Sequence, residues 1–271
     1  MIRIQRGREP QGLAAIRRTE LARVGAIAAV RPPTSDEIGI RYQEVQRAIY
    51  ERQFYKCCYC EFKEQQNYND VEHYRPKAAA DRRPGSLARH GYWWLAWTWQ
   101  NLLFACPTCN RSYKRTQFPL DHGSTALPPP NAPPGSEKPL LLDPADRIDP
   151  IDHIEFCLTS MASRHYWMPR PRSGSRKGEW TIRVVGLDRP DLLDHYNEHV
   201  RVTVMPVVNR IEATLASQNA PAIGTFWAEA TKRLLNARLP LSGLSYDALD
   251  HYFPLVRRQP FALTLPRPSP L

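Results

Sequence analysis

The stretch NLLFACPTCNRSYKRTQFPL, residues 101–120, contains a Cys-x-x-Cys pair with more polar neighbours than a simple zinc knuckle needs. The pair and the residues around it are Asn101, Cys106, Cys109, Asn110 and Lys114. A zinc knuckle uses only its two thiolates. The two amides and the lysine therefore indicate a second chemical task in the same stretch.

A second Cys-x-x-Cys pair lies nearer the N-terminus, and the two pairs together supply the four thiolates of a closed zinc site: Cys57, Cys60, Cys106 and Cys109. Between the pairs lie 45 residues, whereas a zinc ribbon closes after about 15–20. The sequence therefore predicts a structural Zn²⁺ that joins the ends of a longer insert, and that insert has room for another site.

The insert contains VEHYRPK, residues 71–77, in which Glu72 directly precedes His73. Neighbouring residues of a strand point to opposite faces, unless a bulge or the strand end turns them together. One of the two could then bind a metal ion while the other handles a proton. With Asn101 and Asn110 in the same zinc-joined unit, the pattern becomes far more specific than a single Glu-His pair.

These motifs resemble the HNH, or ββα-metal, nucleases. The string CCYCE…VEHYRPK…GYWWLAWTWQNLLFACPTCNRSYK…FPL is most similar to the PtuB-like HNH component of Septu anti-phage defence and to its relatives in retron-associated defence. The resemblance is dense over residues 57–120. It continues more thinly through KPLLLDP, residues 138–144, and TIRVVGL, residues 181–187.

The resemblance implies a role for each motif residue. His73 takes the position of the general base, and Glu72 that of a metal ligand. Asn101 takes the place of the residue that orients the base. Asn110 stands at the third motif position, often a histidine, and is a second candidate ligand. Oxygen ligands of this kind suit Mg²⁺ or Mn²⁺ better than a second zinc. A helix is expected after the second knuckle, with Asn110 and Lys114 on one face.

The charge of the chain favours a polyanionic partner for its first part. Residues 1–120 contain 20 Lys and Arg against 11 Asp and Glu, whereas residues 121–271 contain 17 against 16. Four basic residues near the motifs are candidate phosphate contacts or, equally, solvated surface charges: Arg75, Lys77, Arg111 and Lys114. The aromatic cluster at residues 92–99 could stack on bases, but core packing is the simpler interpretation.

The expected architecture is α+β, with a ββα-metal nuclease core between helical regions. The expected parts are an N-terminal helical lead (1–54), a nuclease core with the four-cysteine zinc (55–122), a Pro-rich linker (123–142) and a mixed, mostly helical C-terminal region (143–271). Periodicity predicts helices over 13–30, 34–54, 189–216, 221–237 and 245–252. Strands are expected over 154–160 and 179–187. Asp143 could support the site or cap a turn.

The sequence therefore predicts a metal-dependent endonuclease that cleaves nucleic-acid phosphodiester bonds, with DNA the expected target and RNA, such as tRNA, the alternative. A zinc-organised binding module without catalysis is a further alternative. The resemblance also implies a partner ATPase, PtuA-like, and residues from about 145 onward are the expected docking surface. The longest apolar stretches are too short to cross a bilayer, and residues 1–10 lack a secretory signal, so a cytoplasmic location is expected.

Overall fold

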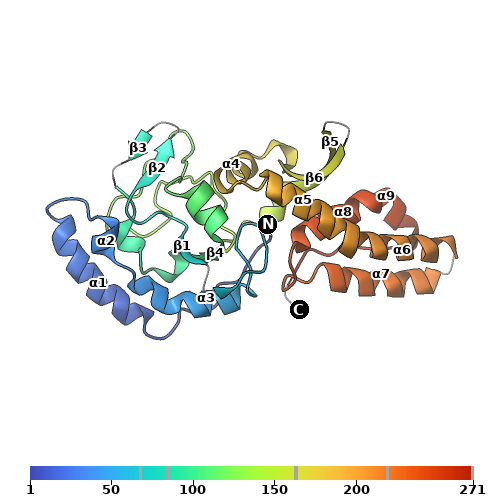
Figure 1. The fold of residues 1–271 in the computed structure, drawn as a ribbon, viewed down its shortest axis with the longest axis horizontal. Helices are drawn as coiled ribbons and strands as arrows, with labels where there is room; N and C mark the ends of the chain where they lie inside the picture. Colours follow the sequence, from blue (N-terminus) through green and yellow to red (C-terminus); the bar gives the residue numbers. More distant parts are fainter. Residues whose placement is uncertain (67–68, 84–85, 89, 162–163, 218–219, 270–271) are drawn as a thin grey trace.

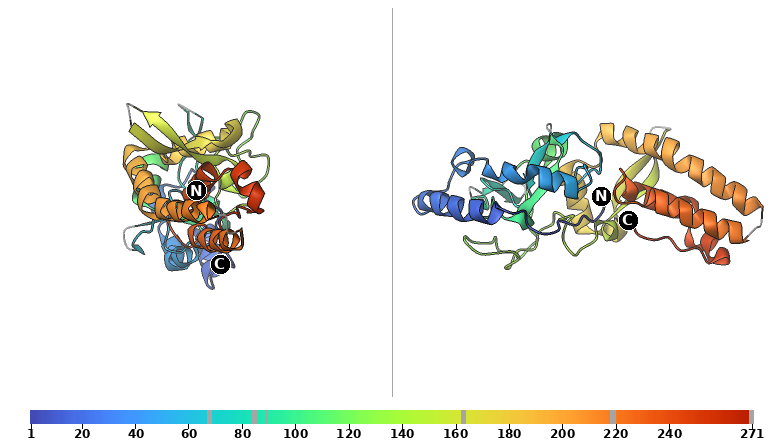
Figure 2. Two further views of the ribbon diagram at one scale, coloured as in Figure 1. Left: turned by 90° about the vertical axis from the view of Figure 1, so that its right-hand side faces the viewer. Right: turned by 90° about the horizontal axis from the view of Figure 1, so that it is seen from below.

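The computed structural model describes residues 1–66, 69–83, 86–88, 90–161, 164–217 and 220–269. The molecule is elongated, with the N-terminal half at one end and the C-terminal helices at the other (Figure 1). Both termini lie near the middle, which the view from below also shows (Figure 2). Helices and small sheets are mixed, in agreement with the predicted α+β class.

The N-terminal lead is helical, but its second predicted helix is divided. The first is α1 (Leu13–Ala28); the second consists of α2 (Ser35–Ile38), the 3₁₀ turn Arg41–Val45 and α3 (Gln46–Arg52). Thr34 caps α2 by accepting a hydrogen bond from the Glu37 amide, and the Glu37 carboxylate accepts one from the Thr34 amide. Gly39, at φ 74°, ends that helix because this left-handed backbone conformation suits glycine.

The centre of the N-terminal half is an antiparallel hairpin of β1 (Asp70–His73) and β4 (Leu102–Ala105), in which Glu72 lies opposite Leu103 and His73 opposite Leu102. Alternate residues of β4 enter different cores. Leu102 and Phe104 pack against α1 and α3, whereas Leu103 and Ala105 pack toward the zinc-knuckle cysteines. The two faces of this hairpin therefore separate Glu72 from His73.

Between β1 and β4 lies a second small hairpin, β2 (Ala80–Arg83) with β3 (Ser86–Ala88), and after β4 comes the π-wound helix Thr108–Lys114. The aromatic cluster is mostly core, as predicted. Its buried members are Tyr92, Trp94, Trp97 and Trp99, and Trp93 is partly exposed. The segment 122–139 forms a loop without helix or strand, in agreement with its composition.

The C-terminal half begins with the hairpin β5 (Ile154–Met161) and β6 (Arg164–Pro171). The strand predicted over 179–187 is wrong, because these residues belong to α4 (Arg176–Val185) and the turn after it. Ser175 caps α4 by accepting from the Gly178 amide, and Gly186 ends it at φ 61°. The capping residues and the burial of one helical face outweigh the β-branched run TIRVV.

The remaining helices follow the predicted periodicity, except α9, which lies beyond the last predicted helix. They are α5 (Pro190–His199), a π-wound turn (Val200–Val204), α6 (Met205–Ala216), α7 (Ala220–Leu234), α8 (Ser242–Tyr252) and α9 (Leu255–Arg258). In Figure 1, α6 and α7 run side by side away from the N-terminal half. Within the described ranges, no helix combines the length and apolar character that crossing a bilayer requires.

The two halves share one hydrophobic core, which contains the four knuckle cysteines as well as residues of α4 to α8. Polar contacts also join them. The Lys56 ammonium donates to the carbonyls of Ala237 at 2.6 Å and Leu239 at 2.8 Å, and Thr181 of α4 accepts from the Leu142 amide. The C-terminal half thus supports the zinc-knuckle unit directly.

Candidate metal and active site

All four residues of β1 line a pocket of about 450 Å³. The pocket brings together residues from β1, the helix Thr108–Lys114, the N-terminal helices and the turn after β1, among them Tyr42, Asp70, Glu72, His73, Lys77, Asn110, Arg111 and Arg115. Three of the four predicted catalytic and metal-binding residues, His73, Glu72 and Asn110, therefore meet at one pocket. Asn101 and Arg75 line a different cavity, which has a volume of about 550 Å³.

His73 is buried against the ring of Tyr42, with the ring centroids 4.5 Å apart and nearly perpendicular. Its Nε2 lies 2.9 Å from the carbonyl oxygen of Ala96. Because a carbonyl can only accept, Nε2 carries the proton and Nδ1 is left as the acceptor. Burial, followed by the charge of Lys77, lowers the pKa of His73 to about 3. The imidazole is therefore neutral at pH 7 and able to accept a proton.

Asn101 joins the two segments that hold His73. Its Oδ1 accepts from the Arg75 amide at 2.7 Å, and its Nδ2 donates to the carbonyls of Arg75 at 3.0 Å and Leu95 at 3.2 Å. Arg75 lies two residues after His73 in the sequence. Leu95 directly precedes Ala96, whose carbonyl contacts the His73 ring. Asn101 thus links the chain after the histidine to the chain that orients its ring.

Glu72 lies on the other face of β1, in an ion pair with Lys114. The Lys114 ammonium is 2.6 Å from Oε1, and the Tyr59 hydroxyl donates to the same oxygen at 3.2 Å. Both charged side chains are almost fully buried. Burial raises the pKa of Glu72, and Lys114 opposes that rise. The contacts with Lys114 and Tyr59 both fall on Oε1.

The helix Thr108–Lys114 presents Asn110 and Lys114 to β1, which agrees with the predicted shared face. Asn110 Nδ2 donates to Oδ2 of Asp70 at 3.0 Å, while Lys114 pairs with Glu72. Residues four apart on the helix thus meet residues two apart on the strand. The side-chain oxygen of Asn110 is the atom of this amide that would bind a cation beside Asp70.

The four basic residues predicted to contact phosphates fall into two groups. Lys77 and Arg111 line the pocket and are at least partly exposed. Arg75 and Lys114 are buried and paired with Glu137 and Glu72, respectively. The phosphate roles stay predictions. Three of the four, Arg75, Arg111 and Lys114, already have carboxylate partners, because Arg111 pairs with Asp70.

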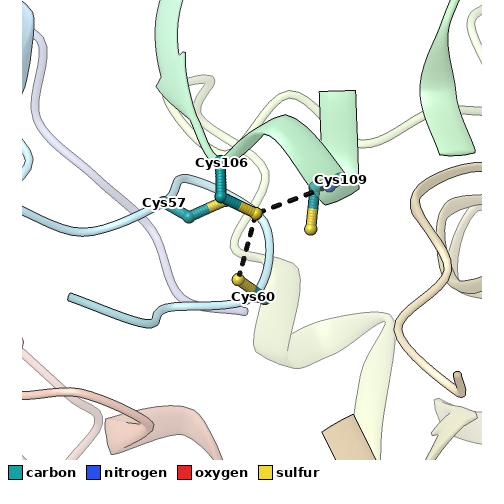
Figure 3. A group of neighbouring side chains, drawn as sticks. All are labelled: Cys57, Cys60, Cys106 and Cys109. Carbon is teal, nitrogen blue, oxygen red and sulfur yellow. Dashed lines mark hydrogen bonds between the residues drawn. The ribbon is translucent and has the colours of Figure 1, made fainter. Parts of the chain in front are cut away.

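The four knuckle cysteines converge on one point (Figure 3). Their sulfur atoms all lie within 4.8 Å of one another, and those of Cys60 and Cys106 are 3.9 Å apart. A tetrahedral zinc with sulfur at about 2.3 Å separates its ligands by about 3.8 Å. The cysteines could therefore hold a metal ion such as zinc. The neighbouring Cys106 sulfur, with burial adding to it, raises the pKa of Cys60 and Cys109, and a bound cation would favour the thiolate forms of these two cysteines.

Arg189, which precedes α5, touches this cluster from the C-terminal half. Its Nη1 donates to Cys109 Sγ at 3.4 Å and to the Gly186 carbonyl at 2.9 Å. Burial disfavours the guanidinium, but the Cys109 sulfur outweighs that effect and raises the pKa of Arg189. A zinc ion with four thiolates carries two negative charges, and this arginine offsets part of them.

Sequence reasoning missed three residues that the structure places in or beside these sites. Asp70 is two residues before Glu72 on the same face of β1, a period-two signal that was available. Arg115 lines the pocket and extends the basic run that includes Arg111. Arg189 gives no local signal, because it lies 80 residues from its cysteine partner.

Three other residues that the sequence singled out, Asp143, His153 and Cys157, do not line the His73 pocket. Asp143 accepts from the Ala145 amide at 2.9 Å and pairs with Arg6 at 3.0 Å, so it caps a turn outside the His73 pocket. His153 contacts the Ser175 hydroxyl next to α4. Cys157 is half-buried on β5.

The chain is similar to a Septu protein. The Septu protein PtuB of Bacillus mycoides (strain KBAB4) is 38% identical to it over 141 residues, which is 51% of this chain and 45% of that protein. The chain thus matches less than half the length of this curated relative. No protein-family model and no solved structure matches the chain. The predicted resemblance to PtuB-like Septu components is confirmed, and the one to HNH nucleases stays a prediction.

Proposed function

We propose that this chain is a metal-dependent HNH-type endonuclease that acts as the effector of an anti-phage defence system. One observation carries the proposal. A neutral histidine with a set tautomer shares a pocket with carboxylate and amide oxygens and with basic side chains. This combination is what hydrolysis of a phosphodiester requires: a proton acceptor, a cation site and countercharge for the phosphate.

His73 accepts the proton of the attacking water at Nδ1. A positioned general base contributes about 100- to 10,000-fold to the rate. Burial makes the free imidazole a weak base, with a pKa of about 3. A phosphodiester in the pocket adds a negative charge near the ring and so raises that pKa toward the working pH.

Glu72 and Asn110 are the oxygen ligands proposed for a catalytic Mg²⁺ or Mn²⁺, and Asp70, whose carboxylate pairs with Arg111, lies beside Asn110. The ion, when bound, supplies positive charge to the phosphate and lowers the pKa of a bound water. The Lys114 ammonium favours the ionised form of Glu72, against the effect of burial. It also donates to the His73 carbonyl at 3.0 Å, which ties the two functional residues to one helix.

Lys77, Arg111 and Arg115 are the proposed phosphate contacts, because they combine exposure with a place at the pocket. Their charges add affinity for the backbone of any nucleic acid and carry no choice between DNA and RNA. DNA is the proposed substrate, and RNA such as tRNA is the alternative.

A partner ATPase of the same defence system is proposed to restrain the nuclease. Exposed apolar side chains in the C-terminal half support docking there: Leu158, Val202, Leu239, Leu255 and Val256. Two of them are adjacent on α9, with 64% and 74% of their surface exposed. Interfaces are anchored by such groups more than by net charge.

The test is a cleavage assay with purified protein on plasmid, single-stranded DNA and tRNA, with Mg²⁺, Mn²⁺ or EDTA. His73→Ala should abolish cleavage and keep the fold, and His122→Ala, an exposed histidine outside the pocket, is the matched control. Equal cleavage activity of His73→Ala and His122→Ala would contradict the proposed role of His73 as the general base. Binding without cleavage by every form of the protein would favour the zinc-organised binding module.

A further inference from the structure

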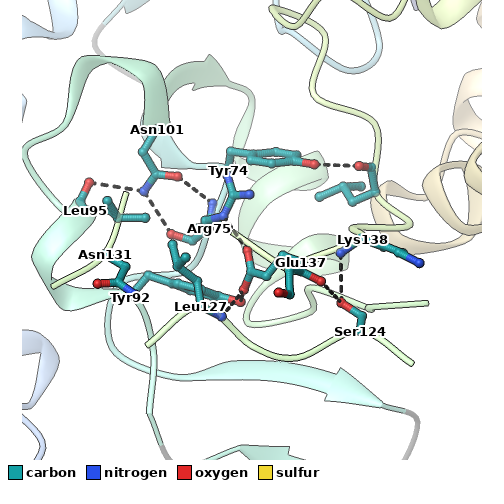
Figure 4. A network of polar contacts seen from close by, with 12 residues as sticks. Tyr74, Arg75, Tyr92, Leu95, Asn101, Ser124, Leu127, Asn131, Glu137 and Lys138 are labelled. Atoms are coloured by element: carbon teal, nitrogen blue, oxygen red, sulfur yellow. Dashed lines mark hydrogen bonds and ion pairs between the residues drawn. The ribbon is translucent and has the colours of Figure 1, made fainter. Parts of the chain in front are cut away.

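The chain directly after His73 is held by residues from far along the sequence (Figure 4). The Tyr74 hydroxyl donates to the Leu141 carbonyl at 2.6 Å. The Arg75 guanidinium pairs with Glu137 at 2.9 Å. Glu137 and its loop therefore contact the segment that follows the histidine.

Glu137 is the most constrained carboxylate of this network. Its side chain has no exposed surface. Besides Arg75 Nε, it accepts hydrogen bonds from the Tyr92 hydroxyl and, at 2.9 Å, from the Leu127 amide. A buried carboxylate is costly unless charge and hydrogen bonds compensate it. Arg75, Tyr92 and Leu127 supply this compensation to Glu137, and their contacts hold the three segments together.

The same arginine is tied to His73 through the backbone. Asn101 binds both the amide and the carbonyl of Arg75, and its remaining contact is the Leu95 carbonyl. The next carbonyl, that of Ala96, accepts the Nε2 proton of His73. A shift of Arg75 would therefore move Asn101 and the carbonyl that sets the histidine tautomer.

We propose that Glu137 is a positioning residue for the general base, which acts through Arg75 and Asn101 to hold His73 in its Nε2-protonated form. The segment 123–142, expected from its composition to be a linker, then serves as a clamp on the catalytic loop. The inference rests on the proposed nuclease function for its kinetic consequence, but its structural consequence at His73 can be measured independently.

The kinetic test compares Glu137→Gln with Glu137→Asp. Gln keeps the size and one acceptor oxygen but loses the charge that pairs with Arg75, whereas Asp keeps the charge on a shorter chain. We expect kcat to fall about 100-fold in Glu137→Gln, the scale of a small misplacement of a reacting group, with KM nearly unchanged. Asp should restore part of the loss. Glu198→Gln is the control, because it breaks an exposed pair with Arg201.

The spectroscopic test needs no activity. Nitrogen-15 correlation spectra of the histidines, with the His73 signal assigned by its absence in His73→Ala, report which ring nitrogen carries the proton. The wild-type protein should show Nε2–H, and Glu137→Gln should show a mixture of the two tautomers. Thermal melting of each variant gives the folded fraction used to correct the rates.

An unchanged His73 signal in folded Glu137→Gln would overturn the proposal, as would a loss of rate no larger than the loss of folded protein. If the wild-type protein cleaves nothing and equals His73→Ala, the nuclease function fails. The tautomer of His73 in Glu137→Gln still decides the positioning role in that case, so the two failures are distinguishable.

Discussion

Replacing Lys114 by methionine should destabilise the protein strongly, because it leaves the Glu72 carboxylate buried without its partner. The pair is 2.6 Å apart and the two side chains are 1% and 3% exposed. At this distance and an effective dielectric constant of 20, the attraction is about 6 kcal/mol, and desolvation of both groups offsets part of it. Breaking a buried pair by removing one partner costs about 3–5 kcal/mol, which is the expected loss in the free energy of unfolding.

The assay is urea unfolding followed by tryptophan fluorescence, for Lys114→Met, Glu72→Gln and the double variant. The double variant removes both charges, so its loss should fall short of the sum of the single losses by about 1–3 kcal/mol. Lys232→Met, an exposed lysine on α7, should change stability by no more than about 0.5 kcal/mol. Additive losses, or a Lys114→Met protein as stable as the control, would refute the buried-pair reasoning.

The pH dependence of Lys114→Met follows from the same pair. Burial raises the pKa of Glu72 above 4.5, and the opposing effect of Lys114 is lost in the variant. The folded variant then binds a proton that the unfolded chain has released. Its stability deficit should be small at acidic pH and grow as pH rises through the folded-state pKa of Glu72. Added Mn²⁺ should stabilise Lys114→Met more than the double variant, because only the former keeps the proposed ligand.

The remaining predictions concern the zinc site and the partner surface. Cys109→Ser should lose its zinc and become insoluble or partly unfolded, since structural zinc contributes about 10–16 kcal/mol in small modules; Cys157→Ser should keep its zinc, and metal analysis of both decides. Arg189→Met should release zinc to a chelator about tenfold faster, because the cluster loses a hydrogen bond and a countercharge; an unchanged rate contradicts that role. Joint replacement of Leu255 and Val256 by aspartate should abolish co-purification with the partner ATPase at unchanged melting temperature, and a surviving complex would place the interface elsewhere.

The parts of the structure that the sequence predicted are those determined by local signals. The Cys-x-x-Cys pairs converge as expected, because each knuckle presents its two sulfurs within a few residues. Helices α7 and α8 follow their apolar spacing, and Thr34 caps α2 through a hydrogen bond three residues away. The error at α4 also has a local cause, since Ser175 and Gly186 were capping signals that the β-branched run concealed.

The parts that the sequence did not predict depend on partners far apart in the chain. Glu137 meets Arg75 across 62 residues, and Arg189 meets Cys109 across 80. Such pairs form only after the core has assembled, so no spacing rule indicates them. Composition misled in the same way. The Pro-rich composition of residues 123–142 predicted a linker. The side chain of Glu137 in this segment nevertheless has no exposed surface.

The crowding of polar residues around the second knuckle follows from the register of the β1–β4 hairpin. Asn101 directly precedes β4, Cys106 directly follows it, and the four strand residues between them pair with Asp70–His73. One short strand therefore connects the amide proposed to orient the base to a cysteine of the candidate metal site. The helix Thr108–Lys114, which begins at the second knuckle, places Lys114 in contact with Glu72. The four-cysteine cluster and the proposed active site thus share one strand, so a disturbance at either end of β4 reaches the other through four residues.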